Sequence, residues 1–290
     1  MVASHAGGSR FESCRAHQFP PQPTTVLPPN LDTVIDEAWS KACKVEGYIG
    51  DREFRALCML AAAPPIGGVS VEIGSFKGKS TIGVASIASA FNLGEVVSID
   101  PHNAPCETDP DLNESATSFD DFQAALTRAG LRNRVEAHRA PSREVAAGWN
   151  RPIRLLWIDG DHTYNGAKLD FDLFKPFLVD GAIVAIHDTL HEFEGPIRVF
   201  VEEMLRSDQF GPASLLHTIG WAQYRPRDGA QFRKQREQLA RKAARLIPLV
   251  ANSRKVEGLT RMRFKLQCAR IPHQILTPAE FSTLLTSTAI

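Results

Sequence analysis

The sequence predicts an α/β fold in which a doubly wound, mostly parallel sheet ends in an antiparallel hairpin. Short apolar, β-branched runs alternate with amphipathic stretches of helical length, a pattern typical of βαβ units whose strands are buried on both faces. Two further runs then follow each other closely, as the strands of a hairpin do. The predicted strands are 69–74, 95–100, 134–138, 154–159, 182–187, 213–218 and 221–225.

The elements between and before these strands are predicted to be helical. Apolar residues recur at helical spacing over 31–63, where Gly47 and Gly50 separate two helices, and a Pro- and Gly-rich stretch ends this region. A tight turn at Gly220 is expected to join the last two strands. The helices predicted within the sheet region are 80–91, 118–130, 142–149, 167–178 and 196–205.

Four regions follow from this pattern. We expect a disordered tail over 1–30, a helical lid or cap over 31–68, the α/β domain over 69–226, and a basic helical extension over 227–290. The long polar connection at 101–117 has the length of a lid or substrate loop.

The composition excludes several classes of protein. Hydrophobic residues make up 43% of the chain and charged residues 23%, as in soluble globular proteins. No run approaches the roughly 20 apolar residues of a membrane span. With 33 basic and 33 acidic residues the formal net charge is zero, so no overall electrostatic field attracts DNA. Five cysteines without a CxxC pair indicate a reducing, cytoplasmic compartment.

A Gly-containing turn follows the first predicted strand and leads into a helix. Gly74 and Gly78 let the backbone approach a ligand closely, and a helix N-terminus favours a carboxylate or phosphate. Three residues separate these glycines, one fewer than a P-loop needs, and Phe76 breaks the GxGxxG fingerprint. The second strand ends at Asp100, where a carboxylate could accept hydrogen bonds from ribose hydroxyls. The Gly-containing turn and Asp100 together predict a nucleoside ligand. The alternative is that Asp100 is a surface residue that merely ends a strand.

Two neighbouring strands each end in an aspartate, Asp159 and Asp188. Carboxylates brought together at one sheet edge repel each other unless a cation lies between them, and Mg²⁺ or Mn²⁺ suits such ligands. His187 is either a third ligand or a core residue, and His162 is placed to act as a general base. The alternative is a set of strand-end caps and ion-pair partners.

With these residues assembled, the segment 69–225 resembles the class I S-adenosylmethionine-dependent methyltransferases, which have a Rossmann-like sheet. Within that group it is similar to the metal-dependent sugar O-methyltransferases related to macrocin and mycinamicin O-methyltransferase, with kinship to cephalosporin hydroxylase-like proteins. The matching motifs are the turn at 72–80, the strand end at 98–100, the segment 158–164 and the pair His187-Asp188.

The resemblance implies two cofactors, S-adenosylmethionine and a divalent metal, Mg²⁺ or Mn²⁺. It places the methionine part of the cofactor on the first turn, the ribose on Asp100 and the adenine beside Ser142. The predicted cofactor contacts are Glu72, Gly74, Ser75, Gly78, Ser80, Asp100, Ser142 and Asp159. The predicted metal ligands are Asp159, His187 and Asp188, and the predicted catalytic residues are His162, as the base, and Asp159.

The leading prediction is therefore an enzyme that methylates a hydroxyl of a sugar or a glycosylated natural product. One alternative is a hydroxylase-like relative, which would need a redox-active metal. Another is a non-catalytic protein that docks on a partner, a membrane surface or RNA through residues 227–270, which carry thirteen basic and three acidic side chains. The same basic stretch could instead be a solvated helical face or support a homo-oligomer.

Overall fold

The computed structural model describes residues 27–63, 66–103, 117–251, 256–274 and 276–286. Most of the predicted tail (1–30) and of the predicted lid loop (101–117) lies outside the described residues.

Within the described residues, seven strands form one sheet in the order β3-β2-β1-β4-β5-β7-β6. The first five strands are parallel, and β7 runs antiparallel to both β5 and β6. The predicted fold class is therefore confirmed, including the antiparallel pair at the end of the sheet. The strands are β1 (Val69–Ile73), β2 (Val96–Ile99), β3 (Val135–His138), β4 (Ile153–Ile158), β5 (Leu178–Ile186), β6 (Phe210–Leu216) and β7 (Ile219–Tyr224).

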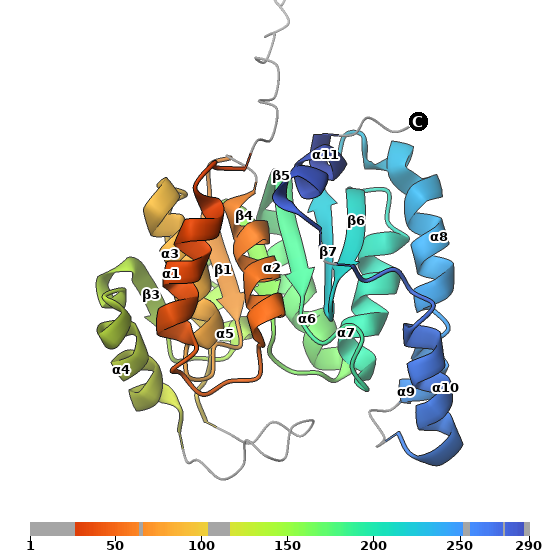
Figure 1. Ribbon diagram of the computed structural model, residues 1–290, viewed down its shortest axis with the longest axis horizontal. Helices are drawn as coiled ribbons and strands as arrows, with labels where there is room; N and C mark the ends of the chain where they lie inside the picture. Colours follow the sequence, from red (N-terminus) through yellow and green to blue (C-terminus); the bar gives the residue numbers. More distant parts are fainter. Residues whose placement is uncertain (1–26, 64–65, 104–116, 252–255, 275, 287–290) are drawn as a thin grey trace, which may run out of the picture.

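Helices cover both faces of the sheet (Figure 1). On one face the core includes residues of α1 (Leu31–Ala42), α2 (Asp51–Ala62), α3 (Lys79–Phe91), α4 (Phe119–Ala129) and α11 (Pro278–Thr286). On the other face it includes residues of α5 (Ser142–Ala146), α6 (Tyr164–Phe174), α7 (Glu194–Val199), α8 (Arg233–Ala243), α9 (Ile247–Val250) and α10 (Gly258–Cys268). A six-residue π-helix, Phe200–Leu205, continues α7.

Strand β4 shows why the strands are continuously apolar. Leu155 and Trp157 belong to the core beneath α1 to α3, whereas Leu156 and Ile158 belong to the core beneath α6 to α10. Because successive side chains of a strand point to opposite faces, a sheet covered on both sides buries every residue. All four side chains are at most 2% exposed.

Several boundaries differ from the prediction by a few residues, and two of these differences have clear local reasons. Helix α6 begins three residues earlier than expected, because the Thr163 hydroxyl accepts a hydrogen bond from the Gly166 amide at 3.1 Å and caps it. The turn between β6 and β7 is not at Gly220 but at His217 and Thr218, which lie between the two strands. Gly220 is a strand residue whose missing side chain leaves room for Phe200 and Thr189.

Two buried arginines attach the terminal segments to the sheet. Arg154 on β4 donates to the Ser70 hydroxyl and to the carbonyls of Ala61 and Ala63, at the C-terminal end of α2. Burial lowers the pKa of Arg154 to about 10.

Arg236 on α8 plays the same role toward the C-terminal extension and is 1% exposed. Its guanidinium donates to five backbone carbonyls, those of Leu205, Ser207, Phe210, Gly211 and Gly229. Each extension is therefore held by a cation that satisfies main-chain acceptors.

In the described part of the chain, no helix is long and apolar enough to cross a membrane.

We expect Arg236→Met to destabilise the protein strongly, because the five carbonyls would lose their donor in a buried setting. An unpaired buried acceptor costs about 1–3 kcal/mol, so a total loss of about 3 kcal/mol or more is expected. Urea unfolding measures this loss. The matched control is Arg233→Met one turn earlier on α8, where Arg233 forms an exposed ion pair with Asp208. Equal shifts of the unfolding midpoint in the two variants would contradict the anchoring role of Arg236.

Candidate active site

The turn after β1 is fixed by close backbone packing. Gly74 has a φ of 84°, and a Cβ atom added there would lie 2.1 Å from the carbonyl oxygen of Asp159. The sequence prediction attributed this glycine to ligand approach, but in the structure the end of β4 excludes a side chain. Gly74 therefore also sets the position of Asp159.

Asp100 at the end of β2 holds this turn in place. One carboxylate oxygen accepts hydrogen bonds from the amides of Ser75 and Phe76, both at 2.8 Å, and the other accepts from the amide of His102 at 2.7 Å. The predicted pairing of the turn with the second strand end is thus observed, and ribose binding by Asp100 stays a prediction.

Glu72 lies beneath the turn and is fully buried. Thr81 donates a hydrogen bond of 2.5 Å to its Oε2 atom, while Oε1 has no hydrogen-bond partner within the described residues. Burial raises the pKa of Glu72 to about 8, although Ser80 and Thr81 oppose the shift. Gly78 precedes α3 as its N-cap, with a φ of 89°. Of the predicted cofactor residues of this turn, Glu72, Ser75, Gly78 and Ser80 are buried and Gly74 is half-buried.

Ser142 begins α5 and connects to the end of β4 through Asp170, which lies 3.2 Å from the position of a Cβ atom added at Gly160. Its hydroxyl donates a hydrogen bond of 2.5 Å to Asp170 on α6. Burial raises the pKa of Asp170 to about 6, against the effect of this hydrogen bond. The predicted place of Ser142 beside adenine stays a prediction.

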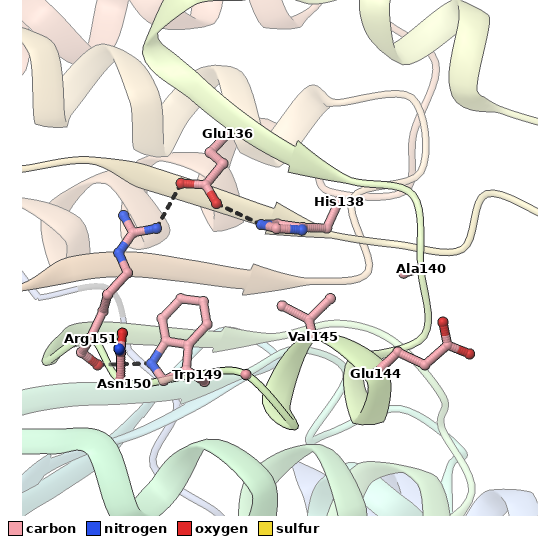
Figure 2. Close-up of a pocket in the computed structure, with 9 residues that line it drawn as sticks. Glu136, His138, Ala140, Glu144, Val145, Trp149, Asn150 and Arg151 are labelled. Carbon is pink, nitrogen blue, oxygen red and sulfur yellow. Dashed lines mark hydrogen bonds and ion pairs between the residues drawn. The ribbon is translucent and has the colours of Figure 1, made fainter.

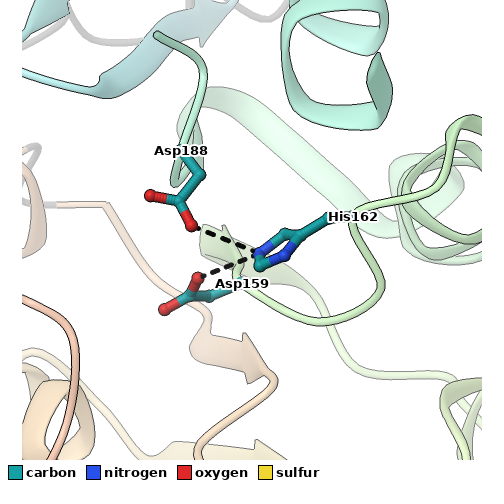
Figure 3. Close-up of side chains that lie close together, drawn as sticks. All are labelled: Asp159, His162 and Asp188. Atoms are coloured by element: carbon teal, nitrogen blue, oxygen red, sulfur yellow. Dashed lines mark ion pairs between the residues drawn. The ribbon is translucent and has the colours of Figure 1, made fainter. Parts of the chain in front are cut away.

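Asp159, His162 and Asp188 converge at the carboxyl edge of β4 and β5 (Figure 3). One ligand atom from each residue lies within 4.8 Å of the other two. The Nε2 atom of His162 is 3.4 Å from Asp188 Oδ2 and 4.0 Å from Asp159 Oδ1. Neither ring nitrogen of His162 has a hydrogen-bond partner in the described part of the chain, and the ring stacks on Phe193 at 4.3 Å. Asp159, His162 and Asp188 therefore form one cluster, and His187, the fourth predicted metal or base residue, contacts both of its carboxylates.

The backbone at Asp188 explains how it joins the cluster. Asp188 has a φ of 54°, a left-handed conformation that few residues other than glycine adopt. The strand geometry of β5 has ended there, so the alternation of side chains no longer applies. His187 and Asp188 can therefore both approach Asp159.

His187 lies between this cluster and α2, with Nδ1 toward the two aspartates and Nε2 toward Glu53. Its Nδ1 atom lies 2.9 Å from Asp159 Oδ1, and its Nε2 atom lies 3.7 Å from Glu53 Oε2. Thr218, from the turn between β6 and β7, donates a hydrogen bond to Glu53. Sequence reasoning missed Glu53. Its Gly50-to-Glu53 capping spacing was visible, but nothing in the sequence brings α2 to the end of β5.

The charged groups of this cluster shift one another's pKa values. Burial alone would lower the pKa values of His162 and His187, but the carboxylates of Asp159 and Asp188 outweigh it and raise both. Burial would raise the pKa of Asp188, yet His187 and His191 hold it well below its usual range. Burial would also raise the pKa of Glu53, but its interactions with His187 and Thr218 outweigh this effect and lower that pKa to about 2. His191, whose Nδ1 atom is 2.9 Å from Asp188 Oδ1, was also missed from the sequence.

A separate hollow of about 420 Å³ lies beside edge strand β3 (Figure 2). Glu136 joins His138 and Arg151 across it, and Trp149 and Val145 form its apolar side. None of the predicted site residues lines it, so we assign the hollow no part in the site.

The sheet order, the Gly-containing turn and the strand-end acids agree with the predicted class I methyltransferase fold. Residues 71–189 match the profile of a protein family described as a methyltransferase domain. The chain therefore carries a methyltransferase domain, which confirms the predicted resemblance and the prediction of an enzyme of this class.

Solved structures support the fold. The O-methyltransferase NovP aligns with 14% identity and a TM-score of 0.56, covering 68% of this chain and 98% of NovP. A protein of Klebsiella pneumoniae that is assigned as an O-methyltransferase aligns with 18% identity and a TM-score of 0.50, covering 68% of this chain and 90% of that protein.

We expect Gly74→Ala to disrupt the site, because its methyl group would displace the Asp159 carbonyl. Both the thermal midpoint and the affinity for S-adenosylmethionine should fall, the latter by at least about tenfold, as calorimetry would measure. Gly130→Ala is the matched control. Gly130 also has a positive φ, of 73°, but no atom lies within 4 Å of the position that an alanine methyl would take, so only backbone strain of about 1 kcal/mol is expected. Full retention of cofactor affinity in Gly74→Ala would show that the packing against Asp159 is unimportant.

Glu72 should make stability fall as pH rises between about 4.5 and 8. The folded chain keeps the Glu72 proton up to about pH 8, whereas the unfolded chain loses it near 4.5, so unfolding releases a proton within this window. One proton corresponds to at most about 1.4 kcal/mol per pH unit. In urea unfolding with EDTA, Glu72→Gln should gain stability relative to wild type as pH rises from 5 toward 8. A constant difference between the two proteins would refute the raised pKa.

Proposed function

We propose that this protein is an S-adenosylmethionine-dependent O-methyltransferase that binds a divalent cation and acts on a hydroxyl of a sugar or a glycosylated natural product. The observation that carries the proposal is the convergence of Asp159, His162 and Asp188 beside the Gly-containing turn of a methyltransferase domain. A hydroxyl acceptor is proposed because NovP, which shares the fold, is an O-methyltransferase. The sugar class rests on the resemblance of the motifs at 72–80, 98–100 and 158–164.

The donor side would use the first turn. Asp100 fixes the amides of Ser75 and Phe76, and the Ser75 hydroxyl is buried without a hydrogen-bond partner within the described residues. A buried hydroxyl of this kind is available to a bound ligand. Bound S-adenosylmethionine would supply an electrophilic methyl group on its sulfonium. The turn and Asp100 would hold that group in line with the acceptor oxygen.

The acid and histidine set fits a divalent cation. Carboxylate oxygens and an imidazole nitrogen are ligands of Mg²⁺, Mn²⁺ or Fe²⁺, with the imidazole favouring the latter two. The ring nitrogens of His162 have no other partner in the described part of the chain, and two carboxylates beside them would repel each other without a cation. A bound cation would lower the pKa of an acceptor hydroxyl, which is ordinarily close to that of water.

The sequence predicted His162 as the base, but the position of its Nε2 atom between both carboxylates favours a second role, as a ligand of the cation. That one nitrogen cannot ligate a cation and accept the hydroxyl proton at the same time. We favour the ligand role, with Asp159 and Asp188 as the other ligands. His187 then serves as a positioning residue that holds the Asp159 carboxylate through Nδ1. Phe193 covers the His162 ring and excludes water from that side.

We expect the whole 290-residue chain to bind S-adenosylmethionine in isothermal titration, and Asp100→Ala to weaken binding at least about tenfold. Asp172→Asn, which removes an exposed carboxylate of α6 that pairs with Lys168, is the matched control and should leave binding unchanged. Absence of binding by the wild type under every metal condition would falsify the proposed function.

Manganese titration of the same samples tests the cation site. Asp188→Asn and His162→Gln should each reduce Mn²⁺ affinity at least about tenfold if His162 is a ligand. Unchanged Mn²⁺ affinity in His162→Gln, together with lost methyl transfer to a panel of sugar hydroxyls, would instead assign the base role. A wild type that binds the cofactor but no divalent cation would contradict the cation site alone.

A further inference from the structure

A second cavity, of about 690 Å³, lies where three distant segments meet. Its walls are the N-terminal turn of α2, the turn between β6 and β7, and the chain that follows α10. Figure 1 shows that last segment, in dark blue, running from α10 across β6 and β7 toward α11. The His217 amide donates a hydrogen bond of 3.3 Å to the His273 carbonyl, which joins two of the walls.

The cavity is lined by basic side chains. We call it the basic groove, after Arg52, His217, Arg270 and His273, and its other lining residues are Ala269, Ile271, Pro272 and Gln274. No carboxylate is among them. Neither Arg52 nor Arg270 forms an ion pair within the described residues. Two guanidinium groups are therefore exposed at the groove without an ion-pair partner among the described residues.

His217 gives the groove a prearranged polar group. It has a φ of 56°, and its Nε2 atom is buried without a hydrogen-bond partner in the described part of the chain. Left-handed backbone at a residue other than glycine and unpaired buried nitrogen both carry a cost, and such costs cluster at binding sites. Burial lowers the pKa of His217, with Arg52 and His273 acting in the same direction and Glu53 opposing them.

The groove and the candidate active site share a wall. Arg52 precedes Glu53, whose carboxylate faces His187, and His217 precedes Thr218, whose hydroxyl donates to Glu53. The Thr218 carbonyl also accepts a hydrogen bond of 2.8 Å from the amide of Thr189, the neighbour of Asp188. Glu53 and Thr218 therefore connect the groove residues Arg52 and His217 to the candidate active site.

We propose that the basic groove binds an anionic group of the methyl acceptor, a phosphoryl or carboxylate group on a hydroxyl-bearing compound. The proposal rests on the proposed function and narrows its substrate class. Guanidinium groups match the planar oxygens of carboxylate and phosphate by paired, charge-assisted hydrogen bonds, and an imidazole adds a further donor or acceptor. The basic C-terminal extension thereby contributes two of the four basic residues of the groove, Arg270 and His273.

Calorimetric titration of the whole chain with glucose 1-phosphate, glucuronate and uncharged glucose tests this, with S-adenosylmethionine affinity measured on the same samples. The groove variant is Arg52→Gln/Arg270→Gln. The matched control, Arg241→Gln/Arg263→Gln, removes the same charge from exposed positions of α8 and α10 outside the groove. Unchanged cofactor affinity shows that a variant is folded.

We expect the wild type to bind at least one anionic sugar more tightly than glucose. The groove variant should lose at least about tenfold in affinity for that anionic sugar, whereas the affinity of the control variant should stay within about twofold of wild type. Selectivity for glucose 1-phosphate assigns a phosphoryl group, and selectivity for glucuronate assigns a carboxylate. Equal losses in both variants would indicate diffuse attraction and overturn the groove. Cofactor binding without preference for either anion would also overturn it while leaving the methyltransferase proposal intact, whereas loss of wild-type cofactor binding would defeat the proposed function itself.

Discussion

The crowding of charge at the ends of β4 and β5 is the constraint on which the rest of the site depends. Asp159 and Asp188 cannot both remain ionised side by side without positive charge between them. His162, His187 and His191 surround them, and each histidine has a ring nitrogen within 3.4 Å of a carboxylate oxygen. The orientation of each group is therefore set by the others, so the cluster behaves as one unit rather than as separate residues.

The cluster also contacts elements outside the central parallel strands. His187 contacts both Asp159 and Glu53 on α2, and Glu53 accepts a hydrogen bond from Thr218 in the turn between β6 and β7. Arg154 fixes the far end of α2 to the sheet, so Glu53 approaches from a rigid helix. The helical segment before the sheet thus supplies a wall of the site.

The sequence predicted those features of the fold and site that depend on local residue patterns. The continuous apolar runs indicated strands buried on both faces, and parallel neighbours place their carboxyl ends at one edge, which was enough to pair Asp159 with Asp188. Glu53 and the four groove residues could not be predicted, because their proximity arises from packing between segments that lie far apart in the chain. The orientation of His187 was equally hidden, since the left-handed backbone at Asp188 breaks the alternation on which such a prediction depends. The sequence identified Gly74 as a position that requires glycine, but the structural reason is its close approach to the Asp159 carbonyl rather than to a ligand.

The position of each anchor along the chain has a consequence for synthesis on the ribosome, where the N-terminal part is made first. The carbonyl partners of Arg154 precede it, so α2 can dock once β4 has emerged. The partners of Arg236 also precede it, but Arg270 and His273 are made later still. A growing chain that has completed β7 therefore contains the Gly-containing turn and the strand-end acids before it contains Arg236, Arg270 or His273. Premature termination there would leave the carbonyl partners of Arg236 without their donor and the apolar residues beneath α8 to α10 uncovered, so the shortened chain would be unstable as well as lacking two of the four groove residues.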